Sequence, residues 1–216
     1  MNNTLMRNTK LAVTALAMMF LLACGGIEAK GYTKQGTDFH KSGDFESAIV
    51  SYNKAIEYDP DYALAYNNRG ASYSNLKQYN RAVEDYSKAI ELDPDAGAYS
   101  NRGLAYNDLE QYDRAIKDYN KAIELDRDDV IAYYNRGITY SNLEQYGRAI
   151  KDYSKAIELE SDYASAYNNR GYVYYKVEQY DKALQDLNKL IELAPNNKRV
   201  ISDRDRLLKD HPYLKK

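Results

Sequence analysis

The chain has 216 residues, a length that allows one compact domain or one short repeat array. Its 30 Lys and Arg residues are balanced by 32 Asp and Glu residues, so the basic excess of a nucleic-acid binder is missing. The mean hydropathy of −0.75 excludes a polytopic membrane protein. A single cysteine excludes an intrachain disulfide, and with only two histidines we expect no metal site and no cofactor.

The N-terminal segment predicts export from the cytoplasm. Arg7 and Lys10 precede an uncharged apolar stretch, residues 11–23, which is shorter than the about 20 residues that a transmembrane helix needs. A basic start followed by a short apolar stretch is typical of a secretion signal. The stretch runs directly into Cys24, and the sequence Leu-Leu-Ala-Cys-Gly at 21–25 resembles the lipobox of bacterial lipoproteins.

This resemblance implies a signal peptide at 1–23, cleavage before Cys24, and a lipid on the cysteine sulfur. Several acyl chains give a lasting anchor, because each buried methylene contributes about 0.8 kcal/mol. Gly25, in place of aspartate, implies sorting to the outer membrane, with the protein facing the periplasm. Residues 24–28 would form a short lipid-anchored linker. The alternative is that Cys24 is incidental in an uncleaved anchor or a plain signal peptide.

A repeat fills the remainder of the chain. Glycines at 36, 70, 103, 137 and 171 are spaced by 34, 33, 34 and 34 residues, and most are preceded by Asn-Arg. This period and content resemble the tetratricopeptide repeat, a helix-turn-helix unit. The resemblance implies an all-α fold of tandem helical hairpins, stacked in a right-handed superhelical solenoid with a C-terminal capping helix. We place the five repeats at 29–62, 63–95, 96–129, 130–163 and 164–197, and the cap and tail at 198–216.

The repeat also explains the 24 tyrosines. Numbering each repeat from 1 to 34, small residues occupy positions 8 and 20, and aromatic residues occupy most of positions 4, 11, 17 and 24. The spacing places positions 4, 8 and 11 on one face of helix A and positions 17, 20, 24 and 27 on one face of helix B. We therefore expect these rings to pack around the small residues. The tyrosines outside these positions are Tyr58, Tyr62, Tyr134, Tyr163, Tyr172, Tyr175 and Tyr213.

Two charged residues recur in repeats 2 to 5. Position 7 is arginine and position 23 is aspartate in each of them. We expect each arginine to pair with an aspartate of a facing helix B, in its own repeat or in the next. The alternative is two independent solvated charges. A partly exposed pair would contribute only about 0–1 kcal/mol. The residues are Arg69, Arg102, Arg136 and Arg170 with Asp85, Asp118, Asp152 and Asp186.

The ends of the array differ from its interior, as in other solenoids. Residues 198–210 continue the pattern as a capping helix that ends before Pro212, with Ile201 and Leu208 at the aromatic positions 4 and 11. The outer face of this helix is expected to be exposed to solvent, because it carries the polar residues Arg199, Ser202, Arg206 and Lys209. Repeat 2 is one residue short, so the turn into repeat 3 should be tighter.

The resemblance also implies where a ligand binds. In this family, positions 2, 5, 9 and 12 of helix A line a concave groove that binds extended peptides or partner helices. The alternative is that these side chains pack adjacent A helices together. The expected groove residues are Asn67, Leu104, Asn107, Ile131, Tyr134, Ile138, Asn168, Tyr172 and Tyr175.

The sequence therefore favours a membrane-tethered scaffold that binds other proteins in the bacterial cell envelope. A self-associating structural array, dimerising as a homo-oligomer through Tyr172 and Tyr175 or through the convex face, is the alternative. Catalysis has no support, because His40 and His211 lie at opposite ends of the array and no glycine-rich phosphate loop occurs. We expect no enzyme activity and no nucleic-acid partner.

Overall fold

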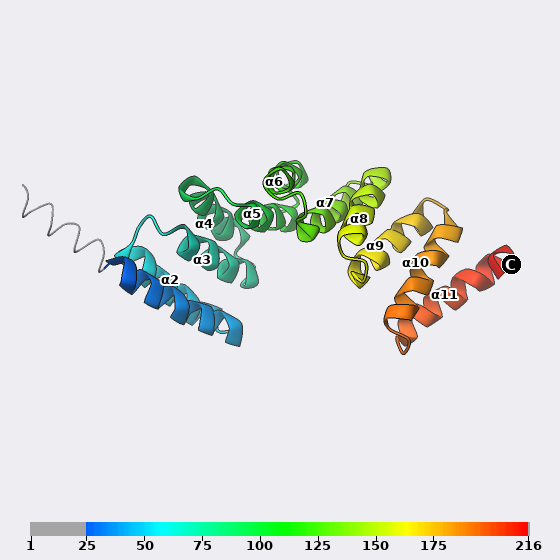
Figure 1. Ribbon diagram of the computed structural model, residues 1–216, viewed down its shortest axis with the longest axis horizontal. Helices are drawn as coiled ribbons and strands as arrows, with labels where there is room; N and C mark the ends of the chain where they lie inside the picture. The colour runs from blue at the N-terminus through cyan, green and yellow to red at the C-terminus, as the bar shows by residue number, and fades with distance from the viewer. Residues whose placement is uncertain (1–24, 216) are drawn as a thin grey trace, which may run out of the picture. The chain divides into compact units, whose positions relative to one another are not determined.

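The computed structural model describes residues 25–215, and every regular element within them is helical. The predicted signal segment and Cys24 lie outside the described residues. The predicted all-α array of tandem helical hairpins is confirmed, because helices of 13 and 14 residues alternate along the chain (Figure 1). After a helical stretch at 25–42, they are α2 Phe45–Tyr58, α3 Ala63–Asn75, α4 Tyr79–Leu92, α5 Ala96–Asp108, α6 Tyr112–Leu125, α7 Val130–Asn142, α8 Tyr146–Leu159, α9 Ala164–Lys176, α10 Tyr180–Leu193 and α11 Lys198–Asp210, followed by the 3₁₀ helix η1 Pro212–Lys215.

The first described residues differ from the expected linker. Residues 25–28 are helical and continue into helix A of the first repeat. Glu28, Ala29 and Lys30 are good helix formers, which favours this extension. Gly25 also lies close to the end of α2, since a Cβ there would stand 2.8 Å from the carbonyl oxygen of Tyr58.

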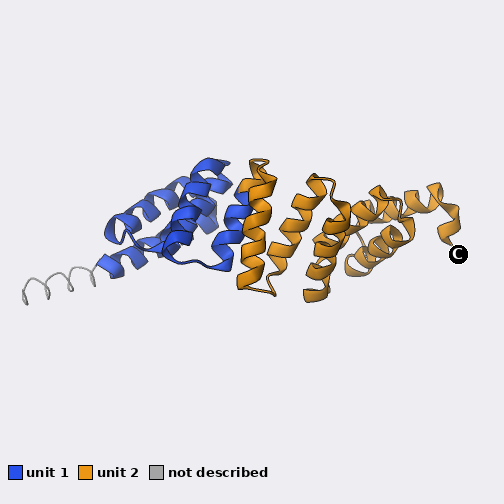
Figure 2. Ribbon diagram, turned by 90° about the horizontal axis from the view of Figure 1, so that it is seen from above, with its two compact units in different colours: residues 1–105 blue, residues 106–216 orange. Residues whose placement is uncertain are grey.

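The chain divides within α5 into two compact units, one ending at Ala105 and one starting at Tyr106 (Figure 2). In unit 1, α3 packs against both α2 and α4. In unit 2, each helix from α6 to α11 packs against the next one along the chain. The contacts are therefore local in sequence, as expected for a linear array of repeats.

The turn from helix A to helix B depends on one residue in the left-handed conformation. Position 15 is Gly43 in the first repeat, with φ of 85°, and a charged residue with φ between 57° and 60° in the other four. Non-glycine residues reach this conformation at a cost of about 1–2 kcal/mol. The backbone amide of the residue after it donates a hydrogen bond to a carbonyl in the last turn of helix A, as where Gln145 N donates to Tyr140 O at 2.8 Å. The four charged residues are Lys77, Glu110, Glu144 and Glu178.

The two helices of a repeat meet where the glycine of position 8 faces the aromatic ring of position 24. A Cβ at Gly137 would lie 2.7 Å from Cε1 of Tyr153, and a Cβ at Gly70 would lie 2.9 Å from the same atom of Tyr86. These distances leave no space for a methyl group. Every alanine at position 20 is likewise buried, which confirms the predicted role of the small residues.

The expected core needs one correction. Of the four aromatic positions, only position 24 is fully buried, whereas the rings at positions 4, 11 and 17 are half-buried. Arginine and lysine side chains cover several of these rings, as where Arg81 lies 5.6 Å from the ring centroid of Tyr73. The inner side of helix A is formed by small residues at positions 3 and 10, which the sequence reasoning did not single out. They are Ala65, Ala98, Ala132 and Ala166, with Ser72, Ala105, Thr139 and Val173.

The loops and the end of the array follow the predicted pattern. Pro60, Pro94 and Pro195 lie in the loops that follow a helix B, where a proline ends a helix without breaking it. The loop before α5 is one residue shorter than its equivalents, and Asp95 Oδ1 accepts a hydrogen bond from Ala98 N there at 3.0 Å. Helix α11 covers the range expected for the cap.

Candidate functional site

Three of the four predicted arginine–aspartate pairs are seen, each within a single repeat. Arg136 donates from Nε and Nη2 to Oδ2 and Oδ1 of Asp152, both at 2.7 Å. This two-pronged geometry fixes the guanidinium and the carboxylate in one plane. The pairing joins helix A to helix B of the same repeat, which decides between the two expected partners. Arg69 with Asp85 and Arg170 with Asp186 form the same pair.

A third bond from each arginine reaches the preceding repeat. Arg136 Nη1 donates to Asn120 Oδ1 at 2.6 Å, and its guanidinium lies 5.4 Å from the ring centroid of Tyr133. One side chain therefore connects three helices, and we call this arrangement the arginine clamp. The acceptor is always position 25 of the previous helix B, a recurrence of Asn and Ser that the sequence reasoning missed. The other contacts are Arg69 to Asn53, Arg102 to Ser87 and Arg170 to Ser154.

The aspartates of the clamps are more buried than expected. Asp152 and Asp186 are 4% and 3% exposed, so these are not the surface pairs assumed from the sequence. Burial raises the pKa of Asp186 above its usual value, although the hydrogen bond and the charge of Arg170 act in the opposite direction. Burial lowers the pKa of Arg170, but the bond and the charge of Asp186 outweigh it and leave that pKa raised. Both charges therefore depend on the pairing.

Helix α9 presents the most accessible part of the predicted surface. Positions 2, 5, 9 and 12 of this helix are all exposed, and Tyr172 and Tyr175 keep 55% and 49% of their surface accessible. Asn168 lies one turn before Tyr172, and its Nδ2 donates to Asn169 Oδ1 at 3.2 Å. Neither α7 nor α9 contains an Asp or Glu residue. Helix α9 therefore contributes aromatic and amide groups to this surface and no carboxylate.

The equivalent residues of α7 are partly used for packing. Ile131 is 51% exposed, whereas Tyr134 and Ile138 are half-buried against the core around Tyr153. The ring of Tyr134 lies 5.0 Å from that of Tyr163, and its hydroxyl accepts a hydrogen bond from Asn169 Nδ2 at 3.1 Å. Tyr134 thus joins successive A helices and gives unit 2 a continuous surface from α7 to α9.

The remaining predicted residues lie on other helices. In unit 1, Leu104 is 42% exposed, and Asn67 Oδ1 accepts a hydrogen bond from Asn101 Nδ2 at 3.2 Å. In unit 2, Asn107 Oδ1 accepts one from Thr139 Oγ1 at 3.0 Å. Both amides therefore bond to the next repeat.

Buried tyrosine hydroxyls of helix B approach the helix A side chains at position 12 of the repeat. Burial raises the pKa of Tyr86 to about 12, and its hydroxyl hydrogen-bonds Ser74 at position 12. The hydroxyl of Tyr119 is buried without a hydrogen-bond partner among the described residues. Burial, reinforced by the charges of Asp108 and Asp118, raises the pKa of Tyr119. Position 12 of its repeat is Asn107, whose side-chain oxygen accepts a hydrogen bond from Thr139 instead.

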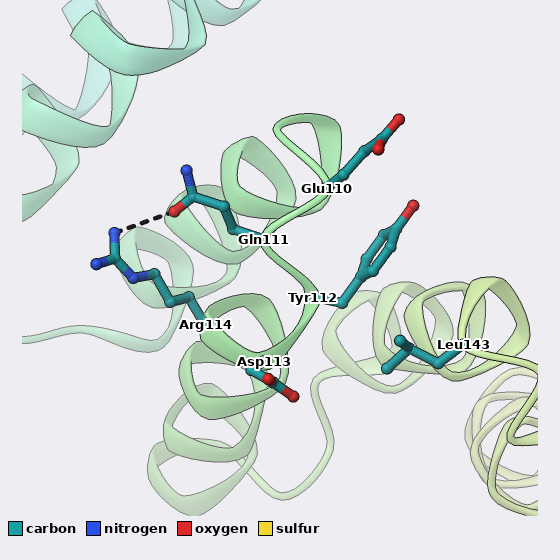
Figure 3. Close-up of a pocket in the computed structure, with 6 residues that line it drawn as sticks. All are labelled: Glu110, Gln111, Tyr112, Asp113, Arg114 and Leu143. Carbon is teal, nitrogen blue, oxygen red and sulfur yellow. Dashed lines mark hydrogen bonds between the residues drawn. The ribbon is translucent and has the colours of Figure 1, made fainter.

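Concave features in unit 2 lie elsewhere, at the turns between helices A and B. An open depression of about 330 Å³ surrounds the turn before α6, where Arg114 Nη1 donates to Gln111 Oε1 at 3.0 Å (Figure 3). A second depression surrounds the turn before α8 and reuses the same positions of the repeat. The first is lined by Glu110, Gln111, Tyr112, Asp113, Arg114 and Leu143, none of which belongs to the predicted surface.

Within residues 25–215, no three His, Cys, Asp or Glu side chains are grouped so that they could hold a metal ion. No helix in this range is long and apolar enough to cross a bilayer.

Comparison with known families decides the identity of the repeat. A model described as TPR repeat matches residues 36–77, 103–144 and 142–178, which together are more than half of the chain. A second model, tetratricopeptide repeat, matches residues 63–95 and 164–197. The chain belongs to the tetratricopeptide repeat family. Tetratricopeptide repeats are in general scaffolds for protein–protein interaction, and proteins of this fold are typically non-catalytic.

Solved tetratricopeptide structures resemble the whole array. YrrB, described as a TPR protein with an unusual peptide-binding site, is 25% identical, with a TM-score of 0.65 over 81% of this chain and 90% of that one. MamA is 28% identical, with a TM-score of 0.69 over 76% and 96% of the two chains. PilF of Pseudomonas aeruginosa, at 22% identity, shares the fold with a TM-score of 0.77 over 86% and 85%. No curated protein matches the chain.

Proposed function

We propose that this chain is a membrane-tethered tetratricopeptide scaffold of the bacterial cell envelope, which binds partner peptides or helices along helix A of its repeats. The observation that carries the proposal is the exposed pair Tyr172 and Tyr175 on a helix without Asp or Glu. Exposed aromatic residues on a rigid support are the usual anchors of protein interfaces.

The chemistry of the α9 surface suits an extended peptide. The tyrosine rings offer apolar contact area, and they lose little conformational entropy on binding because each has only two side-chain torsions. The amide of Asn168 is exposed and can exchange its bond to Asn169 for bonds to a peptide backbone. YrrB, which has the same fold, is described with a peptide-binding site, and this supports the same use of the array.

The membrane anchor rests on the sequence around Cys24. A lipid at this residue would hold the first repeat close to the bilayer, because the helical residues 25–28 advance only about 1.5 Å each. The α9 surface belongs to the fifth repeat and would be separated from the anchor by four repeats. We expect this spacing to leave the surface accessible to partners in the periplasm.

Affinity capture from solubilised membranes tests the binding surface. We expect the wild-type chain to retain partners that a Tyr172→Ala/Tyr175→Ala variant loses. Leu125→Ala/Leu193→Ala is the matched control, because these exposed apolar residues end two B helices. Equal recovery of the same partners by the wild type and the tyrosine variant would remove the surface from the proposal.

Fractionation of cells tests the anchor. Replacing Cys24 by serine removes the sulfur that would carry the lipid, so we expect the variant to leave the membrane fraction and to lose metabolic labelling by a fatty acid. A Ser42→Cys change in the Cys24→Ser background is the control for a thiol at a wrong position. A Cys24→Ser chain that still sediments with membranes contradicts the anchor.

A further inference from the structure

Helix α11 repeats the orientation of an A helix. Counted from Lys198 as position 1, its buried residues Val200 and Leu207 occupy positions 3 and 10. The buried Ala166 and Val173 of α9 occupy these same positions. Helix α11 packs against α10 as α9 packs against α8, so both helices turn the same side toward the preceding helix B. The cap therefore carries its own positions 2, 5, 9 and 12 on the side that α9 uses for its tyrosines.

Three of those four positions on α11 are basic, and none of them is aromatic. Arg199, Ser202, Arg206 and Lys209 are all exposed, and the side chains of Arg199 and Arg206 keep 87% and 69% of their surface accessible. The sequence pattern predicted that these residues form the solvent-exposed outer face of the capping helix. The buried register instead makes them the continuation of the surface that carries the tyrosines of α9.

A line of aromatic contacts connects the two parts. Tyr175 lies 5.5 Å from the ring of Tyr180, which stacks on His211 with centroids 3.7 Å apart. The ring of His211 lies 5.9 Å from that of Tyr213, which is 59% exposed. His211 follows Lys209 by two residues, so the aromatic surface of α9 continues to the basic end of α11.

The charge on this surface is only partly neutralised. Asp203 is the carboxylate that contacts the two arginines, at 3.9 Å from Arg199 and 3.4 Å from Arg206. One carboxylate thus serves two guanidinium groups, and all three side chains are at least 40% exposed. Exposed ion pairs of this kind are weak and exchange readily for pairs with a ligand. Helix α11 as a whole contains five Lys and Arg residues and three Asp residues, so its net charge is positive.

We propose that the surface formed by α9 and α11 selects protein segments in which aromatic or aliphatic residues lie next to a cluster of acidic residues. Tyr172 and Tyr175 hold the apolar part, and Arg199, Arg206 and Lys209 hold the carboxylates. This inference rests on the proposed function and adds the chemistry of the partner to it. Because α9 has no Asp or Glu and the exposed face of α11 carries three cations, this surface disfavours a basic segment.

Panning a library of random twelve-residue peptides on the full-length chain in mild detergent tests the inference. We expect the selected peptides to be enriched in aromatic residues adjacent to Asp or Glu. With an Arg199→Glu/Arg206→Glu/Lys209→Glu variant, the acidic enrichment should disappear and Lys or Arg should replace it. A selected acidic peptide should bind this variant at least tenfold more weakly than the wild type, as measured by fluorescence anisotropy.

The control carries the same change of charge on helix B. A Lys117→Glu/Lys151→Glu/Lys182→Glu variant alters three exposed lysines outside the surface and should select the same acidic peptides as the wild type. Wild-type peptides without acidic enrichment, or unchanged selection by the α11 variant, would overturn the inference and leave the proposed function standing. Failure of every peptide to bind would contradict both the inference and the proposed function. Vesicles of phosphatidylglycerol that bind through the three cations, while acidic peptides do not, would also overturn it.

Discussion

The arginine clamp of the fourth repeat gives the sharpest test of how the helices are held together. Replacing Arg136 by leucine leaves the Asp152 carboxylate, 4% exposed, without its partner. The change also removes the bond to Asn120, which joins this repeat to the previous helix B. A buried charge that loses its partner costs about 3–5 kcal/mol. We therefore expect Arg136→Leu to destabilise unit 2 by about that amount.

The double variant Arg136→Leu/Asp152→Leu separates pairing from packing. It removes both charges together, and apolar replacements of a buried pair are often neutral in stability. We expect it to recover most of the loss, which corresponds to a coupling energy of at least about 2 kcal/mol in a double-mutant cycle. Arg148→Leu is the control, because Arg148 is exposed, donates to Gln145 just before α8 and lies 5.5 Å from the ring centroid of Tyr140. Its loss should cost about 0–1 kcal/mol.

Urea unfolding followed by far-UV circular dichroism, with hydrogen exchange of the amides of α7 and α8, measures these changes. Hydrogen exchange is needed because the stability of a repeat array is distributed over its repeats. Additive effects of Arg136→Leu and Asp152→Leu, or an Arg136→Leu cost no larger than that of Arg148→Leu, would refute the clamp as a stabilising connection.

Five further substitutions test three other features, each by urea unfolding of the full chain. Tyr119→Phe should stabilise the protein by about 1–2 kcal/mol because its buried hydroxyl has no described partner, whereas Tyr153→Phe, which loses bonds to Ser141 and Asn169, should cost about 1 kcal/mol. Equal effects would contradict this. Gly137→Ala should cost about 1–3 kcal/mol through its clash with Tyr153, and Gly147→Ala, with nothing within 4 Å, should stabilise α8 by about 0.5–1 kcal/mol. A neutral Gly137→Ala would argue against the close helix approach. Glu144→Gly should stabilise the turn before α8 by up to about 1 kcal/mol because it relieves a φ of 57°, and a loss of stability would contradict the strain.

The repeat period was sufficient to predict the fold class and the close approach of the two helices in each repeat. Glycine at position 8 recurs because a side chain there would meet the ring of position 24, as a Cβ at Gly137 would meet Tyr153. Alanine at position 20 recurs at a site that is fully buried. This constraint operates within a single hairpin, so it is visible as a pattern in the sequence. An ion pair between Arg136 and an aspartate of a facing helix B was predictable for the same reason, since both positions recur together, but the structure decided that the partner is Asp152 of the same repeat.

The depth of each side chain was not predictable from the period. Tyr86 and Tyr73 are both aromatic residues at core-facing positions, yet Tyr86 is 3% exposed and Tyr73 is half-buried beneath Arg81. The difference depends on which helices cover each face, and a neighbouring helix in an array is supplied by another repeat. The buried positions 3 and 10 were missed because they hold small residues, which resemble surface residues in a sequence pattern.

What the sequence by itself determined was periodic: the helical hairpins and their period, the small residues at their crossings, and the arginine and aspartate positions that recur together. Only the tertiary structure decided what lies between repeats. In the structure, the third bond of the Arg136 clamp goes to the preceding helix B. Tyr134 is half-buried against the core, whereas Tyr172 remains accessible. Helix α11 buries the same positions as an A helix. The physical reason is that burial and hydrogen bonding between repeats depend on the side chains of two repeats at once. Those side chains differ from copy to copy even where the period itself is constant.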